Sequence, residues 1–136
     1  MRALTPLFGY GTFRNAAWRE AIFERDHAAR PARLQGYRKV ACASGYLSLQ
    51  RSDDPGAQVE GVLIELDEAG WELADAWEEV PKYRRIAVVV ETAGGAVEAT
   101  TYVCADDRGA VPVDDERLAL HSEAEVDAAI RRFRRR

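Results

Sequence analysis

Two short segments, residues 7–14 and 75–85, contain the residue types that could bind and transform a small ligand. The first reads Leu-Phe-Gly-Tyr-Gly-Thr-Phe-Arg, so an apolar strand is followed by a turn with two glycines. Because glycine has no Cβ, Gly9 and Gly11 would let the backbone turn sharply and come close to a ligand. Successive exposed N–H groups in such a turn can bind an anion. The segment therefore predicts an anion-binding turn after the first strand.

The second segment offers a carboxylate, Glu78, near the end of a helix expected over residues 67–79. At about 100° per residue, Glu78 falls in line with Trp71 and Ala74 on a sheltered side of that helix. A carboxyl group beside such neighbours is partly desolvated, which raises its pKa toward neutrality and suits a general acid/base. The alternative is an ordinary exposed glutamate at a helix end, and the helical projection leaves it open.

The same projection divides the other residues of this helix into two faces. The apolar face, expected to pack on the core, consists of Leu73, Trp77 and Val80. The acidic face, expected to be solvated, consists of Glu72, Asp75 and Glu79.

Hydrophobic periodicity and turn signals predict about six strands and three helices. The strands are expected at residues 5–10, within 32–50, and at 58–66, 86–90 and 97–104, and the helices at 16–26, 67–79 and about 122–136. Gly36 and Gly45 should interrupt the second strand region, and Asp67 should cap the second helix. Helices inserted between strand-rich stretches, without a regular βαβ series, favour an α+β architecture in a single domain over residues 1–136.

Composition limits the classes of function. With 136 residues, 47% of them hydrophobic, and a net charge of −4, the chain suits one soluble domain and argues against a nucleic-acid partner. The arginines of residues 131–136 are expected at a helix end, where they complement the helix dipole. No apolar run is long enough to span a membrane and no secretory signal is visible, so we expect a cytoplasmic protein without a membrane partner. Cys42 and Cys104 lie in apolar segments and are expected to be buried, reduced thiols.

Familiar nucleotide-binding and nucleophile motifs are incomplete. Residues 9–14 have arginine where a dinucleotide-binding GxGxxG requires its third glycine, and there is no P-loop. Residues 41–45 lack the first glycine of a GxSxG nucleophile elbow. His27 and His121 have no catalytic partner or metal-binding spacing nearby and are expected in surface or capping roles.

Four segments, in order, resemble the γ-glutamylcyclotransferase-like superfamily, and most closely its AIG2-like branch, which includes the γ-glutamylamine cyclotransferases. Tyr-Gly-Thr-Phe at residues 10–13 is similar to the family's Tyr-Gly-Ser/Thr-Leu turn. Val-Glu-Gly-Val-Leu-Ile-Glu-Leu at residues 59–66 is similar to its Val-x-Gly-x-Leu-Tyr-x-Leu strand. Ala-Asp-Ala-Trp-Glu-Glu at residues 74–79 is similar to its Leu-Asp-x-x-Glu-Gly helix end, and Tyr-Arg-Arg at residues 83–85 to its Tyr-x-Arg pattern.

The resemblance implies a small mixed β-barrel with flanking helices, and a pocket between the first turn and the helix that carries Glu78. It implies an enzyme that releases 5-oxoproline and a free amine from a γ-glutamyl amine or peptide. Glu78 would be the general acid/base, and the reaction would need no metal or cofactor. The residues that the resemblance assigns to substrate binding are Tyr10, Gly11, Thr12, Phe13 and Tyr83.

Two departures from the family pattern, and two other classes of function, stay open. Phe13 replaces the commoner leucine and would narrow the pocket. Glu79 replaces glycine, and an offset of one residue would make Glu79 the acid, although the helical projection argues against it. The chain could instead be a non-catalytic module that binds a small carboxylated metabolite, or an interaction protein that uses a basic C-terminal helix. The sequence indicates neither an oligomeric state nor the identity of the leaving amine.

Overall fold

The structure is a computed structural model that describes residues 4–24, 28–42, 47–78, 83–106, 109–112 and 131. Most of the expected C-terminal helix at about 122–136 lies outside these residues, as do Gly45, Glu79, Val80 and both histidines. The elements are β1 (Thr5–Gly9), a short 3-10 helix η1 (Thr12–Arg14), α1 (Ala16–Phe23), β2 (Ala29–Gln35), β3 (Tyr37–Ala41), β4 (Leu47–Arg51), β5 (Gln58–Leu66), α2 (Glu68–Trp77), β6 (Tyr83–Thr92), β7 (Gly95–Cys104) and β8 (Val111–Pro112).

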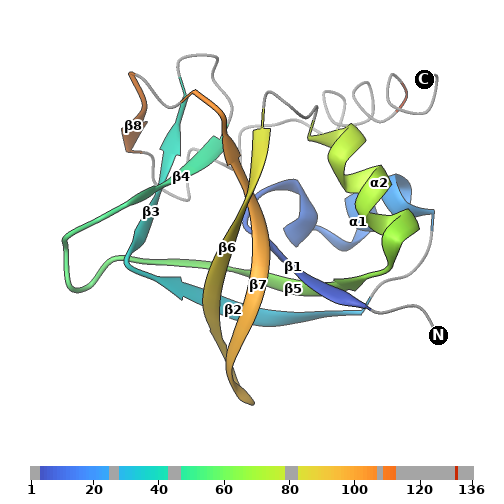
Figure 1. Cartoon of the computed structure of the whole chain (residues 1–136), viewed down its shortest axis with the longest axis horizontal. Helices are drawn as coiled ribbons and strands as arrows, with labels where there is room; N and C mark the ends of the chain where they lie inside the picture. The colour runs from blue at the N-terminus through green and yellow to red at the C-terminus, as the bar shows by residue number, and fades with distance from the viewer. Residues whose placement is uncertain are drawn as a thin grey trace.

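Five strands close into a barrel in the order β1-β5-β2-β6-β7, and β4, β3 and β8 form a separate three-stranded sheet (Figure 1). Leu7 of β1 lies opposite Thr100 of β7 in a parallel pairing that closes the barrel. The expected α+β class and barrel with flanking helices are confirmed. The described residues contain eight strands rather than about six. One reason is that β8, which pairs with Val40 and Ala41, has only two residues and is too short to show a periodicity.

Side-chain capping sets both described α-helices. The carboxylate of Asp67 accepts a hydrogen bond from the N–H of Gly70 at 2.8 Å, which confirms the expected N-cap of α2. The side chain of Asn15 caps α1 in the same way, accepting from the N–H of Ala17 at 2.9 Å. The α1 helix ends at Phe23 rather than at residue 26, because Glu24 adopts a left-handed conformation with φ of 56°.

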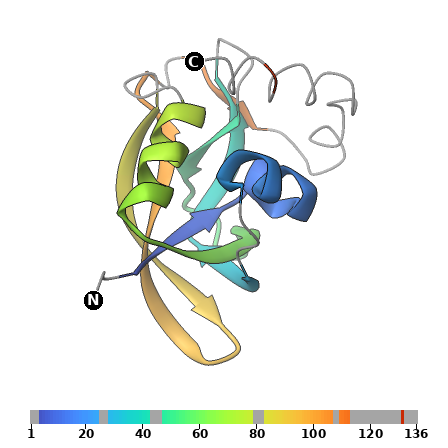
Figure 2. The same cartoon turned by 90° about the vertical axis from the view of Figure 1, so that its right-hand side faces the viewer.

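Two apolar clusters form the core, and Figure 2 shows α1 and α2 packed together on one side of the barrel. The first cluster joins the helices to the barrel and contains Leu7, Phe13, Ile22, Phe23, Cys42, Ile64, Leu66, Trp71, Ala74, Tyr83, Tyr102 and Cys104. The second draws on all five barrel strands and contains Phe8, Tyr10, Ala32, Leu34, Leu49, Val59, Leu63, Val88, Val90, Ala99 and Val103. Strand β5 contributes alternate residues to the two clusters, as its sequence predicts.

The end of β1 approaches its neighbours so closely that two positions have no room for a side chain. A Cβ added at Gly61 would lie 2.3 Å from the carbonyl oxygen of Gly9 and 2.8 Å from the ring of Phe8. A Cβ added at Gly9 would lie 2.6 Å from the Cβ of Phe13. Neither glycine has a positive φ, so both provide space rather than an unusual backbone conformation. The sequence predicted that the open side of Gly9 would face a ligand, whereas Phe13 occupies it.

The substitution Gly61→Ala is expected to lower the free energy of unfolding by about 1–3 kcal/mol, because backbone at Gly9 cannot move aside as a flexible side chain can. Urea unfolding measures this difference. The matched control is Gly94→Ala, whose new Cβ would meet only the Thr92 hydroxyl at 3.7 Å, and its effect should stay within about 0.5 kcal/mol. Equal unfolding midpoints for the two variants would contradict the close approach.

Candidate active site

Glu78 is the residue at which α2 ends, and its backbone N–H donates to the carbonyl oxygen of Ala74 at 2.9 Å. The residue as a whole is half-buried. Burial of its carboxyl group raises the pKa from the ordinary 4.5 to about 8. Ala74 and Trp71, which the helical projection placed beside it, are both buried, whereas Leu73 and Trp77, which were expected on the core face, are only half-buried against the core. The structure therefore agrees with a desolvated carboxyl group at this position and not with an ordinary exposed one.

Tyr10 lies within electrostatic reach of Glu78. Its hydroxyl donates to the carbonyl oxygen of Tyr102 at 2.5 Å and accepts a hydrogen bond from Ser48. Burial above all, and then the charges of Glu78 and Tyr83, raise the Tyr10 pKa well above its ordinary value. Tyr10 is still neutral at the pH where Glu78 ionises. The negative charge of Glu78 therefore raises the Tyr10 pKa, whereas Tyr10 carries no charge that could raise the Glu78 pKa. Its proton is held by a backbone carbonyl, so the hydroxyl is not available as a base.

Removing this hydroxyl in Tyr10→Phe is expected to lower the free energy of unfolding by about 1–2 kcal/mol, because a buried hydrogen bond is lost and the Ser48 donor loses its acceptor. The control is Tyr37→Phe, which removes a hydroxyl whose contact with Arg51 is long, at 3.5 Å, and exposed. Urea unfolding of both variants should show a clear loss for the first and a few tenths of a kcal/mol for the second.

The start of β4 contacts both tyrosines of the site and was not singled out from the sequence. The Tyr83 hydroxyl donates to the carbonyl oxygen of Leu47 at 2.8 Å. Ser48 is fully buried, and its oxygen accepts the backbone N–H of Cys104 at 2.8 Å while its hydroxyl group bonds to Tyr10. The only sequence signal for this role was a serine placed between two leucines of a strand.

The other residues expected to bind substrate are arranged differently. Phe13 is buried, and its ring stacks on that of Phe23 with 5.6 Å between centroids, so its side chain is used in packing against α1. Its carbonyl oxygen accepts a hydrogen bond from Arg19 at 2.8 Å. Gly11 is exposed, and its carbonyl oxygen accepts from the N–H of Arg14 at 3.0 Å, which closes the turn that begins η1 at Thr12. Tyr83 and Glu78 thus both lie within electrostatic reach of Tyr10, and Gly11 is an exposed part of the turn that follows β1.

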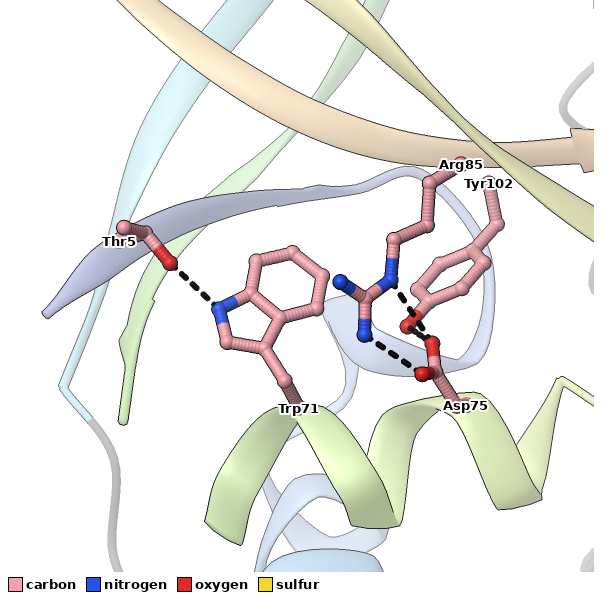
Figure 3. A network of polar contacts seen from close by, with 5 residues as sticks. All are labelled: Thr5, Trp71, Asp75, Arg85 and Tyr102. Atoms are coloured by element: carbon pink, nitrogen blue, oxygen red, sulfur yellow. Dashed lines mark hydrogen bonds and ion pairs between the residues drawn. The ribbon is translucent and has the colours of Figure 1, made fainter. Parts of the chain in front are cut away.

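Asp75 was expected on a solvated acidic face, and this expectation is wrong. Arg85 of β6 donates to its carboxylate through Nε at 2.9 Å and through Nη2 at 2.5 Å, and the Tyr102 hydroxyl of β7 donates to it at 2.5 Å (Figure 3). The Arg85 guanidinium also lies 4.6 Å from the centre of the Trp71 ring. The helical projection failed here because it contains no information about which charges of the barrel face the helix.

The expected state of the cysteines is also corrected. Cys42, which follows β3, and Cys104, at the end of β7, are buried as predicted but form a disulfide rather than two thiols. They lie far apart in the chain and without a motif, so only the tertiary fold brings them together. Within the segments that the structure describes, there is no group of three His, Cys, Asp or Glu side chains suited to a metal ion. No helix in those segments has the length and apolarity needed to cross a membrane.

The chain belongs to the γ-glutamyl cyclotransferase, AIG2-like family, whose model matches residues 7–123. This membership confirms the resemblance found in the sequence and agrees with the expectation of an enzyme. A comparison with curated proteins finds no match.

Solved structures share the fold. The solution structure of At3g28950.1 from Arabidopsis thaliana has a TM-score of 0.70 at 24% identity, and the match covers 97% of this chain and 81% of that one. A γ-glutamyl cyclotransferase has a TM-score of 0.69 at 18% identity, with coverage of 95% and 99%. An AIG2-like protein from Mus musculus has a TM-score of 0.60 at 21% identity, with coverage of 76% and 78%. At these identities the likeness establishes the fold.

Proposed function

We propose that the protein is an enzyme that converts a γ-glutamyl amine or peptide into 5-oxoproline and a free amine by intramolecular cyclisation. The observation that carries this proposal is the Glu78 carboxyl group at the end of α2, which is within electrostatic reach of Tyr10 and has a pKa raised by burial to about 8. An acid/base works best when its pKa is close to the working pH. Membership of the γ-glutamyl cyclotransferase, AIG2-like family supports the reaction class.

The chemistry requires one group that takes up and returns a proton. The Glu78 carboxylate first takes a proton from the α-ammonium group of the substrate, and the α-amine so formed attacks its own γ-carbonyl carbon and forms the ring C–N bond. When the tetrahedral intermediate collapses, Glu78 returns that proton to the leaving amine as its C–N bond breaks, and the second proton lost by the ring nitrogen is taken up by the released amine, which departs as an ammonium ion. No water or co-reactant is consumed. Holding the substrate folded supplies the proximity that such a ring closure needs.

The proposal assigns the glutamyl α-carboxylate to the turn at residues 10–13, where backbone N–H groups would hold it through charge-assisted hydrogen bonds. The electrostatic effect of Glu78 on Tyr10, the first residue of the turn, supports this assignment. The hydroxyls of Tyr10 and Tyr83 both donate to backbone carbonyl oxygens, so we assign their rings as walls of the site. Gly11, Thr12 and Phe13 would contribute backbone groups, since the Phe13 ring packs in the core.

The test is detection of 5-oxoproline by mass spectrometry, with the wild type and a panel of γ-glutamyl amines and dipeptides. Release that depends on Glu78 would establish the reaction, and the best substrate of the panel would identify the type of leaving amine. If the folded protein releases 5-oxoproline from no member of the panel, the proposal is wrong. Binding of 5-oxoproline or a γ-glutamyl compound without turnover would then favour the non-catalytic binding module.

A further inference from the structure

The position of Glu78 depends on how the last turn of α2 is held against the barrel. Glu78 follows that turn directly and is tied to it by the hydrogen bond to Ala74. Trp71, Asp75 and Glu78 are spaced by four and three residues, so they lie along one side of the helix. Along this side, Trp71 Nε1 donates to the Thr5 hydroxyl at 2.6 Å near the start of α2. Asp75 is the next contact with the barrel and lies one turn before Glu78.

The contact at Asp75 has the geometry of a strong ion pair. Two nitrogen atoms of Arg85 donate to its two carboxylate oxygens, which is the bidentate arrangement that fixes direction as well as distance. The side chains of Arg85 and Asp75 are only 44% and 35% exposed, so water screens the pair less than it would at an open surface. The Arg85 guanidinium is itself held over the Trp71 ring, as Figure 3 shows.

Tyr102 joins this ion pair to the other half of the candidate site. Its hydroxyl donates to Asp75, and its backbone carbonyl oxygen accepts the hydroxyl of Tyr10. Hydrogen bonds therefore run from Asp75 to Tyr102 and on to Tyr10, and the Glu78 carboxylate lies within electrostatic reach of Tyr10. A shift of the end of α2 would have to break the hydrogen bond between Tyr102 and Asp75.

We propose that Asp75, held by Arg85 and Tyr102, is a positioning residue that keeps the Glu78 carboxyl group beside Tyr10. Its catalytic consequence rests on the proposed function, whereas its effect on Glu78 does not depend on turnover. Asp75 is the Asp of the Leu-Asp-x-x-Glu-Gly-like pattern at residues 74–79, and Arg85 is the Arg of the Tyr-x-Arg pattern at residues 83–85. The two residues bind each other, so this role links the two patterns.

The test compares Tyr102→Phe and Asp75→Asn with a control, Thr5→Val, which breaks a different side-chain hydrogen bond between α2 and the barrel, the one from Trp71 to Thr5. Tyr102→Phe removes one oxygen atom and keeps the carbonyl group that holds Tyr10. The first measurement is steady-state turnover of the γ-glutamyl substrate, which gives kcat and KM. The second is the pKa of the Glu78 carboxyl group by NMR of protein with ¹³C-labelled glutamate. The variant Glu78→Gln identifies the signal.

Both variants at the ion pair are expected to lower kcat about ten- to hundredfold with little change in KM, because the acid/base is displaced from the reacting atoms. The Glu78 pKa should fall from about 8 toward 4.5 as its carboxyl group gains water. Among the residues that the structure describes, Tyr10 lies within electrostatic reach of Glu78 and of Tyr83, Asp75 lies one helical turn before Glu78 and is paired with Arg85, and Arg19 of α1 is bound to the Phe13 carbonyl oxygen. Tyr102→Phe keeps the ion pair and does not change the net charge of the protein. A fall of the Glu78 pKa in this variant therefore reports a change in the position of Glu78.

Thr5→Val should lower the melting temperature but leave kcat and the Glu78 pKa unchanged. If Tyr102→Phe and Asp75→Asn behave like Thr5→Val, the positioning role is wrong. If the wild type releases no 5-oxoproline while the Glu78 pKa falls in Tyr102→Phe, the proposed function fails and the positioning of Glu78 is upheld. Should Asp75→Asn fail to fold, Tyr102→Phe decides the question alone.

Discussion

Replacing Glu78 with glutamine is expected to reduce the release of 5-oxoproline by about 10²–10⁴-fold, the usual contribution of a general acid/base. Glutamine has nearly the same size, and its amide stays neutral and exchanges no proton in this pH range. The variant Glu78→Gln therefore preserves the shape of the site and removes only the proton transfer. Initial rates of release, measured by mass spectrometry with the best substrate of the panel, give the factor.

The matched control is Glu72→Gln, because Glu72 is an exposed glutamate on the same helix. It should retain wild-type turnover, and circular dichroism should show that both variants are folded. In the wild type, kcat/KM should rise as the pH approaches about 8, since Glu78 must lose its own proton before it can accept one from the substrate. Wild-type turnover in Glu78→Gln would remove Glu78 from the mechanism.

The same substitution is expected to make the folded protein more stable at alkaline pH. The pKa of Glu78 is about 8 when folded and near the ordinary 4.5 when unfolded, so between these values the folded state binds more protons. The contribution of Glu78 to the free energy of unfolding is therefore fully present below about pH 4.5, and it is lost as the pH rises through about 8. The difference in pKa sets an upper limit of about 5 kcal/mol, at about 1.36 kcal/mol per unit. Because Glu78 is half-buried, we expect about half of that.

Urea unfolding of the wild type and Glu78→Gln at about pH 5 and about pH 9 measures this effect. The variant should gain about 2–3 kcal/mol relative to the wild type over that interval. Glu72→Gln should show no such gain, because its carboxylate is exposed in the folded state. Parallel pH dependences for the wild type and Glu78→Gln would mean that the Glu78 carboxyl group is solvated.

The sequence predicted those features that are decided by neighbours within a few residues. The bounds of β5 followed from alternating apolar residues at 58–66 and match the structure. The Asp67 cap followed from a side chain that reaches an N–H three residues away. The sheltered position of Glu78 followed from the repeat of the helix, which places it beside Trp71 and Ala74 whatever the helix packs against. Four short patterns in the right order also indicated the family, which the match over residues 7–123 confirms.

The tertiary structure alone decided which distant groups meet. Asp75 and Arg85 form an ion pair because the fold brings a residue of α2 to one near the start of β6, and Cys42 and Cys104 form a disulfide because it brings the residue after β3 to the last residue of β7. The ring of Phe13 entered the core for a similar reason, since α1 supplied Phe23 as its partner. Local periodicity shows the buried side of β5, but in α2 the fully buried residues are Gly70, Trp71 and Ala74 rather than the expected Leu73 and Trp77, which are half-buried. Periodicity also does not show what the buried side of an element meets. Contacts between elements depend on how the barrel closes, and a closed barrel brings together residues from all parts of the chain.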